Sequence, residues 1–167
     1  MSSPSLTIGQ SAPDFTLSSK TADGIERITL SEEVKKNNIV LLFFPMAFTG
    51  VCTEEMCSVT SELNAYADLK ATVYGISGDN PFAQEAWRIK EKINITLLSD
   101  YEHHVANAYG IAYESFLPAI GLGMSGVPKR SAFVIDRAGV IQYSETHDDP
   151  KQLPNFDEIK ACLAKLA

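Results

Sequence analysis

The stretch that decides the fold reads Ile39-Val-Leu-Leu-Phe-Phe44, then Pro45-Met-Ala-Phe-Thr-Gly50, then Val51-Cys-Thr-Glu-Glu-Met-Cys57. Six consecutive apolar residues, 39–44, predict a buried strand. Pro45 ends this strand because proline has no N–H group to donate to a sheet ladder. Thr49 and the glycine after it supply a capping hydroxyl and a flexible turn, so a helix is expected from about Val51. The sequence therefore predicts a strand–loop–helix unit with Cys52 in the first helical turn.

The position of Cys52 at the start of the predicted helix bears on the reactivity of its thiol. At a helix start, the first backbone N–H groups lack intrahelical partners and the positive end of the helix dipole lies close by. Both features favour a thiolate over a thiol. Most free cysteines, however, are simply small buried hydrophobic residues. The local sequence raises a reactive cysteine as the first hypothesis and leaves a structural cysteine open.

Length and composition predict one globular domain spanning residues 1–167, with 45% hydrophobic and 21% charged residues. The net charge of −7 argues against nucleic acid or an anionic membrane surface as a partner, because both attract positive charge. No apolar run approaches the roughly 20 residues that a membrane-spanning helix needs. The N-terminus lacks the pattern of a signal peptide, so a cytoplasmic location is expected.

The reactive side chains are few: the cysteines are Cys52, Cys57 and Cys162, and the histidines are His103, His104 and His147. An odd, low cysteine count does not suggest a disulfide framework. The absence of a Cys-x-x-Cys pair argues against a thioredoxin redox motif and against a paired zinc knuckle. No histidine has metal-ligand spacing with the cysteines, and His103 and His104 are expected at the surface. No metal or cofactor is predicted, and Cys162, on a terminal amphipathic helix, is expected to be structural.

Hydrophobic periodicity divides the chain into alternating strands and helices. After a loosely held leader at 1–13, the predicted elements are a hairpin (14–17 and 27–30), a short helix (31–36), the strand 39–44, a helix (51–69), strands (72–77 and 95–98), helices (80–92 and 101–109), a hairpin (131–136 and 140–143) and a helix (155–166). Strand–helix alternation followed by an antiparallel hairpin predicts a mixed sheet covered by helices. The predicted fold class is α/β, a thioredoxin-like fold whose central mixed sheet is flanked by helices.

Residues 111–130 differ in character from the rest. Apolar residues alternate there with glycines and prolines, which predicts an ordered surface loop with an exposed apolar side over 115–127. An exposed apolar patch usually marks a contact surface. A homodimer interface is the favoured interpretation, and a surface that binds unfolded proteins is the alternative.

The residues from Phe44 to Cys52 resemble the Pro-x-x-x-Thr-x-x-Cys active-site motif of the peroxiredoxins. The resemblance covers almost the whole chain, because further segments match in the right order. They are Gly9-Gln-Ser-Ala-Pro-Asp-Phe15, the Phe-x-x-x-Ala-Trp pattern within Ser77 to Trp87, Leu98-Ser-Asp100, Tyr109-Gly110 and Arg130-Ser-Ala-Phe-Val-Ile-Asp136. The motif around Cys52 looks most like the alkyl hydroperoxide reductase E group, whereas the spacing Cys-x-x-x-x-Cys resembles the bacterioferritin-comigratory-protein group.

The resemblance implies a thiol-dependent peroxidase that reduces hydrogen peroxide and organic hydroperoxides through a sulfenic acid on Cys52. Arg130 would stabilise the thiolate and donate to the peroxide oxygens. The Thr49 hydroxyl would accept from the peroxide while donating to the thiolate. Pro45 would shield the thiolate and narrow the pocket. This chemistry needs neither histidine nor metal, unlike papain-like Cys–His catalysis.

Two further residues are implied as supporting groups. Glu55 is placed like the glutamate that supports the active-site arginine in many peroxiredoxins, although on position alone it could equally lie on a solvated helix face. Trp87 corresponds to a family residue beside the active-site arginines, although a tryptophan is more often part of the core.

Cys57 is implied as the resolving cysteine, which would form an intramolecular disulfide with Cys52. Residues five apart on an α-helix have Cα atoms about 8.7 Å apart, whereas a disulfide needs about 4.4–6.8 Å. The first helical turn would therefore have to unwind. The alternative is a packed thiol in a one-cysteine peroxidase that relies on an external thiol.

The implied partners are thioredoxin or a glutaredoxin-like reductant and a second copy of the chain. Two other functions stay open at this point. One is a general thiol–disulfide oxidoreductase on the same fold, which the missing Cys-x-x-Cys pair disfavours. The other is a peroxide-sensing or holdase protein that presents the apolar loop.

Overall fold

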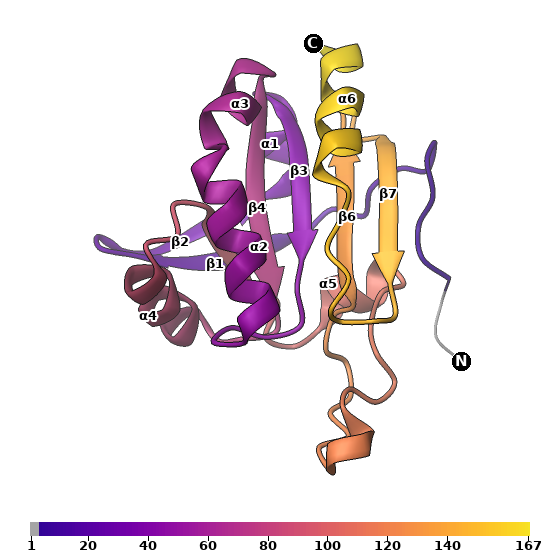
Figure 1. Cartoon of the computed structure of the whole chain (residues 1–167). Helices are drawn as coiled ribbons and strands as arrows, with labels where there is room; N and C mark the ends of the chain where they lie inside the picture. The colour runs from indigo at the N-terminus through magenta and orange to yellow at the C-terminus, as the bar shows by residue number, and fades with distance from the viewer. Residues whose placement is uncertain (1–3) are drawn as a thin grey trace.

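The computed structural model describes residues 4–167 and contains one seven-stranded sheet in the order β2-β1-β5-β4-β3-β6-β7 (Figure 1). The strands are β1 (Thr16–Thr21), β2 (Gly24–Thr29), β3 (Asn38–Phe43), β4 (Ala71–Ser77), β5 (Thr96–Ser99), β6 (Arg130–Ile135) and β7 (Ile141–His147). Strands β3, β4 and β5 run parallel to one another, and all other neighbours are antiparallel. The mixed sheet predicted from the sequence is confirmed.

Helices cover both faces of the sheet. They are α1 (Leu30–Glu33), α2 (Gly50–Ser61), α3 (Leu63–Asp68), α4 (Pro81–Glu91), α5 (His104–Ala108), the short 3₁₀ helix η1 (Pro118–Ile120) and α6 (Phe156–Leu166). Helices α2, α3, α4 and α6 contribute buried residues to the core on one face, and α1 and α5 contribute to the core on the other. Figure 1 shows η1 at the tip of a loop that projects beyond the end of the sheet.

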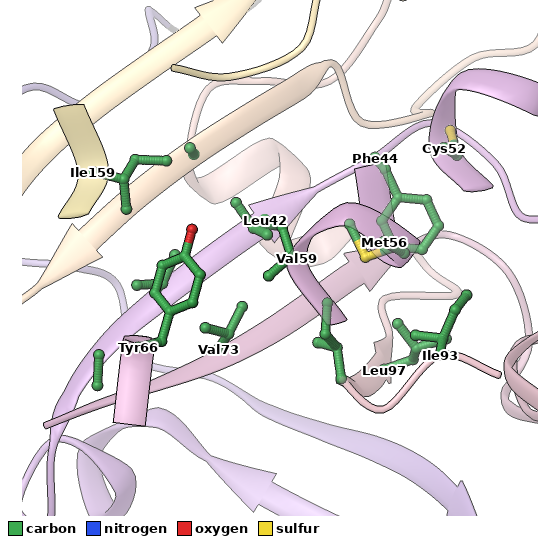
Figure 2. Packing of buried hydrophobic residues seen from close by; sticks show 14 of the residues in the cluster. Leu42, Phe44, Cys52, Met56, Val59, Tyr66, Val73, Ile93, Leu97 and Ile159 are labelled. Atoms are coloured by element: carbon green, nitrogen blue, oxygen red, sulfur yellow. The ribbon is translucent and has the colours of Figure 1, made fainter. Parts of the chain in front are cut away.

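The central strands are buried on both sides, which explains the continuous apolar run in the sequence. Every residue of β3 is buried, with side chains alternating between the two cores. Figure 2 shows the core under α2, where Phe44 and Met56 pack together and Cys52 lies at the margin of the cluster. The loop that begins at Pro45 therefore follows a strand that is buried along its whole length.

The helix predicted over residues 51–69 is in fact two helices. Glu62, with φ −110° and ψ 10°, leaves the helical region and separates α2 from α3. No glycine or proline marks this position, so the break has no sequence signal.

The N-terminal segment is held more firmly than predicted, over the part that the structure describes. Gly9 N–H donates to the Ile141 carbonyl at 2.8 Å, and Ala12 N–H donates to the Gly139 carbonyl at 2.9 Å. The segment thus pairs with the first residue of β7 and with the turn before that strand. The part of the predicted leader at residues 1–3 lies outside the described residues.

One predicted surface histidine is also placed differently. His104 is exposed, as expected, but His103 is half-buried, and its ring contacts both Gly78 and Gly126. A Cβ atom at either glycine would collide with this ring. The histidine therefore packs between the end of β4 and the loop that carries η1.

Candidate active site

A short loop leads from β3 to α2. Phe44 N–H donates to the Ile76 carbonyl at 3.0 Å and continues the sheet by one residue before Pro45. The Ala47 N–H donates to the Asp79 carboxylate at 2.8 Å, which ties the loop to the end of β4. Phe48 has a φ of 65°, a left-handed conformation that is unfavourable for a residue with a side chain. Such strain is held by surrounding contacts and is common in functional loops.

Cys52 lies in the first turn of α2, as predicted, and only 1% of it is exposed. The Nη2 group of Arg130 donates to its Sγ atom at 3.2 Å. A charged donor stabilises negative charge on the sulfur atom more than a neutral one does. The two residues are 78 positions apart in the chain and meet because β6, which begins at Arg130, pairs antiparallel with β3.

Arg130 is itself buried and is held by two further partners. Its Nη1 group pairs with the carboxylate of Glu55, and both its Nε and Nη2 groups donate to the Pro150 carbonyl, at 3.1 and 2.9 Å. The buried location of Glu55 settles its placement: this residue faces the arginine and not solvent.

The carboxyl group of Glu55 is in an unusual environment. Burial raises its pKa to about 7, although the positive charge of Arg130 opposes this rise. Its Oε1 atom has no hydrogen-bond partner among the described residues. The Glu55 charge that faces the arginine is therefore sensitive to pH near neutrality.

Thr49 occupies the N-cap position of α2, but its side chain makes no capping hydrogen bond, in contrast to the sequence prediction. The hydroxyl donates instead to the Met46 carbonyl at 2.7 Å. Its proton is thus engaged, and among residues 4–167 no hydrogen bond joins it to Cys52. In this arrangement the Thr49 oxygen is free to accept a hydrogen bond but not to donate one to sulfur.

Trp87 is fully buried and packs against α2. Among the described residues, no hydrogen bond joins it to Arg130. Its indole N–H donates to the Thr53 hydroxyl at 3.1 Å, and its ring packs with Phe44 and Phe48 at centroid distances of 5.3 and 6.5 Å. Thr53 in turn donates to the Thr49 carbonyl at 2.9 Å. Trp87 therefore packs against the N-terminal half of α2 through Thr53.

A cavity of about 190 Å³ opens beside Cys52. Its lining comes from Pro45, Met46, Thr49, Gly50, Val51 and Cys52 of the loop and helix, Phe116 and Leu117 of the projecting loop, and Arg130, Pro150 and Lys151. The cavity brings together the four residues predicted as catalytic: Pro45, Thr49, Cys52 and Arg130.

Sequence reasoning missed three contributors to this site. The Pro150 acceptor is a backbone carbonyl, and a backbone group has no signature in the sequence. Phe116 and Leu117 were expected only as part of an exposed apolar loop, whereas Phe116 is buried against the cavity.

The other two cysteines have different surroundings. The thiol of Cys57 is directed at the Glu91 carbonyl at 3.6 Å, and that of Cys162 at the Gln142 carbonyl at 3.5 Å. Burial raises the pKa of both thiols, with the Glu91 carboxylate adding to the effect at Cys57. Both environments favour a neutral thiol over a thiolate.

Residues 4–167 contain neither a candidate metal centre nor a candidate membrane-spanning helix. Within this range no group of three or more histidine, cysteine, aspartate or glutamate side chains is arranged to hold a metal ion. The same range contains no helix with both the length and the apolar character needed to cross a bilayer.

Comparison with known proteins agrees with this geometry. Residues 8–144 match the model of the AhpC/TSA family. The chain is 32% identical to alkyl hydroperoxide reductase E of Mycobacterium tuberculosis over 142 residues, covering 84% of this chain and 85% of that protein. It is 30% identical to the chloroplastic 2-cysteine peroxiredoxin of Chattonella marina var. antiqua over 151 residues, covering 86% of this chain and 72% of that protein.

Solved structures give the same result. Peroxidoxin BcpB of Mycobacterium tuberculosis is similar with a TM-score of 0.81 and 26% identity, over 97% of this chain and 99% of that one. A peroxiredoxin-like protein of Aquifex aeolicus is similar with a TM-score of 0.83 and 25% identity, over 99% of this chain and 90% of that one. The chain therefore belongs to the AhpC/TSA family of peroxiredoxins, which are thiol-dependent peroxidases.

Proposed function

We propose that the protein reduces hydrogen peroxide and organic hydroperoxides, with Cys52 as the residue that is oxidised. The contact between Arg130 Nη2 and Cys52 Sγ at 3.2 Å carries this proposal. The Cys52 thiolate attacks the terminal peroxide oxygen, so an S–O bond forms while the O–O bond breaks. Sulfur loses two electrons and becomes a sulfenic acid, and the departing oxygen takes up a proton and leaves as water or an alcohol.

The residues around Cys52 suit the needs of this step. Negative charge moves from sulfur to the departing oxygen. The guanidinium of Arg130, held in place beside the sulfur, can stabilise this charge at both positions. Thr49 offers an acceptor for the peroxide O–H group, since its own proton is bonded to the Met46 carbonyl. Pro45 and the apolar part of the cavity exclude water from the reacting atoms.

We further propose that Cys57 resolves the sulfenic acid. Its thiol would attack the Cys52 sulfur, form an intramolecular disulfide and release water. A dithiol protein such as thioredoxin or a glutaredoxin-like protein would then reduce this disulfide by thiol–disulfide exchange. A cytoplasmic location suits such a cycle, because that compartment supplies the reductant. The alternative is a one-cysteine peroxidase in which an external thiol attacks Cys52.

The test is peroxide consumption by the reduced protein and by Cys52→Ser. The wild type should consume one equivalent of hydrogen peroxide per chain without a reductant and turn over continuously with thioredoxin and its reductase. Cys52→Ser should lose this activity completely, and Cys162→Ser should keep it. Retained turnover in Cys52→Ser would overturn the proposal. An insulin-reduction assay separates it from a general thiol–disulfide oxidoreductase, which would reduce insulin without peroxide.

A further inference from the structure

Arg130 depends on a backbone carbonyl that neither α2 nor β6 provides. Two of its three guanidinium nitrogens donate to the oxygen of Pro150, at 3.1 Å from Nε and 2.9 Å from Nη2. The second of these nitrogens is the one that also donates to Cys52. If Pro150 moved, the Nη2 group of Arg130 would lose the carbonyl acceptor that holds it next to the Cys52 sulfur.

Pro150 belongs to the connection between β7 and α6, residues 148–154, which we call the strap. Figure 1 shows this connection at the same end of the sheet as the start of α2. The strap contains no helix or strand. Between its ends it has a turn, in which the Gln152 N–H donates to the Asp149 carbonyl at 3.1 Å, and one buried residue, Pro154. At its far end, the Asn155 N–H donates to the Glu145 carboxylate at 2.9 Å.

At the near end, the strap is attached to the projecting loop. The Tyr113 hydroxyl donates to the Asp148 carbonyl at 2.6 Å, and the Lys129 ammonium pairs with the Asp148 carboxylate at 2.7 Å. The Asp148 side chain is 87% exposed, so the ion pair is screened by solvent. Burial raises the pKa of Tyr113 to about 12, and the charge of Asp148 adds to the rise, so the phenol remains a donor throughout the physiological range.

Tyr113 also contacts the wall of the cavity. Its ring packs against Phe116, which lines the cavity, at a centroid distance of 5.0 Å, and the Lys129 ammonium lies 5.7 Å from its ring centre. Lys129 directly precedes Arg130 in the chain. Tyr113 thus connects the strap, the cavity wall and the residue before the arginine.

We propose that Tyr113, with support from Lys129, is a positioning residue for the peroxidase reaction: it fixes the strap so that the Pro150 carbonyl holds the Arg130 guanidinium against Cys52. This inference rests on the proposed function. Tyr113 touches neither the sulfur atom nor the cavity's reacting centre, and it acts only through the strap and the arginine.

The test uses Tyr113→Phe, which removes the hydroxyl and keeps the ring that packs on Phe116. The rate constant for oxidation of reduced Cys52 by hydrogen peroxide is measured by stopped-flow fluorescence of Trp87, the single tryptophan. It should fall about five- to tenfold, the effect of roughly one lost hydrogen bond on a transition state. Tyr101→Phe, which alters an exposed tyrosine elsewhere, is the matched control and should react at the wild-type rate.

A second measurement distinguishes a specific effect on the position of Arg130 from a general loosening of the site. Alkylation of Cys52 by iodoacetamide, followed by peptide mass mapping, depends on the thiolate but develops no charge on a departing peroxide oxygen, so in Tyr113→Phe its rate should fall less than the peroxide rate does. Lys129→Gln should show a smaller loss of the peroxide rate, under twofold at physiological salt. An unchanged peroxide rate in Tyr113→Phe, or equal loss in both reactions, would overturn the inference. If instead wild type fails to react or Cys52→Ser still reacts, the proposed function itself fails.

Discussion

The three cysteines differ in what surrounds their sulfur atoms. Cys52 faces a charged donor from Arg130, whereas the thiols of Cys57 and Cys162 face backbone carbonyls, which can only accept a hydrogen bond. A donor stabilises a thiolate, and an acceptor stabilises a thiol. The surroundings therefore favour a thiolate at Cys52 and a thiol at Cys57 and Cys162.

Glu55 should make the stability of the protein depend on pH in an uncommon direction. Its pKa is about 7 in the folded state and near 4.5 in an unfolded chain. Between these values the folded state binds the additional proton, so the free energy of unfolding decreases as pH rises from about 4.5 to 7. The total contribution is on the order of 3 kcal/mol, at about 1.4 kcal/mol for each pKa unit. Glu55→Gln should lack this decrease.

The measurement is urea denaturation of reduced protein at several pH values from 5 to 8. The difference in unfolding free energy between Glu55→Gln and wild type should shift in favour of the variant as pH rises and level off above pH 7. Glu54→Gln, which alters the exposed neighbouring residue, should run parallel to wild type. Parallel curves for Glu55→Gln as well would show that Glu55 is ionised throughout, held so by Arg130.

At the scale of elements, α2 is suited to lose its first turn. Thr49 occupies the N-cap position without capping, and Gly50 is the first helical residue. Both features reduce the free energy needed to unwind the turn. That unwinding is what a bond between Cys52 and Cys57 requires, because the two residues are separated by more than one turn of helix.

Intact-mass measurement after one equivalent of peroxide tests whether the first turn of α2 unwinds to allow a bond between Cys52 and Cys57. Wild type should lose two hydrogens through an internal disulfide, with a small decrease in helical circular dichroism. Cys57→Ser should instead gain one oxygen, as a sulfenic acid. Full turnover of Cys57→Ser with thioredoxin, without any internal disulfide in wild type, would favour the one-cysteine mechanism. A covalent dimer would implicate Cys162.

The elements that sequence reasoning placed correctly are those with strong local signals. Asn80 and Pro81 predicted the start of α4, and Asn80 does accept a hydrogen bond from the Ala83 N–H at 2.9 Å. The break at Glu62 was not predictable because no glycine or proline marks it, and the position of the N-terminal segment was not predictable because its hydrogen bonds reach residues more than 100 positions away. For the site, the motifs located Cys52 and Arg130, but the carbonyl of Pro150 became visible only when the strap was placed in space.

At the scale of the whole molecule, one sheet carries two cores, so we propose that residues 1–167 fold as a single domain. Part of the apolar surface stays uncovered: Ile120 and Leu122 on the projecting loop are 69% and 53% exposed. We propose that a second copy of the chain covers these two side chains. They would lie at the apolar centre of a modest dimer interface.

Sedimentation or light scattering of the reduced and oxidised protein should therefore give the mass of a dimer. Leu122→Glu should shift the population to monomer, because it buries a charge at the contact. Ile25→Glu, which alters an exposed apolar residue on β2, is the control and should leave the dimer intact. A wild-type monomer that suppresses aggregation of an unfolded client would favour the holdase alternative.

The N-terminal segment that pairs with the start of β7 limits how copies of this chain can join. A sheet grows into a neighbouring molecule by offering the unused hydrogen-bonding groups of an edge strand. The Gly9 N–H and the Gln10 carbonyl already occupy the backbone groups of Ile141 at the start of β7, and the opposite edge strand, β2, carries the adjacent charges of Glu26 and Arg27. Both features disfavour continuation of the sheet into a neighbouring molecule at these points, which leaves loops and helix faces, such as the projecting loop with Ile120 and Leu122, as surfaces for association.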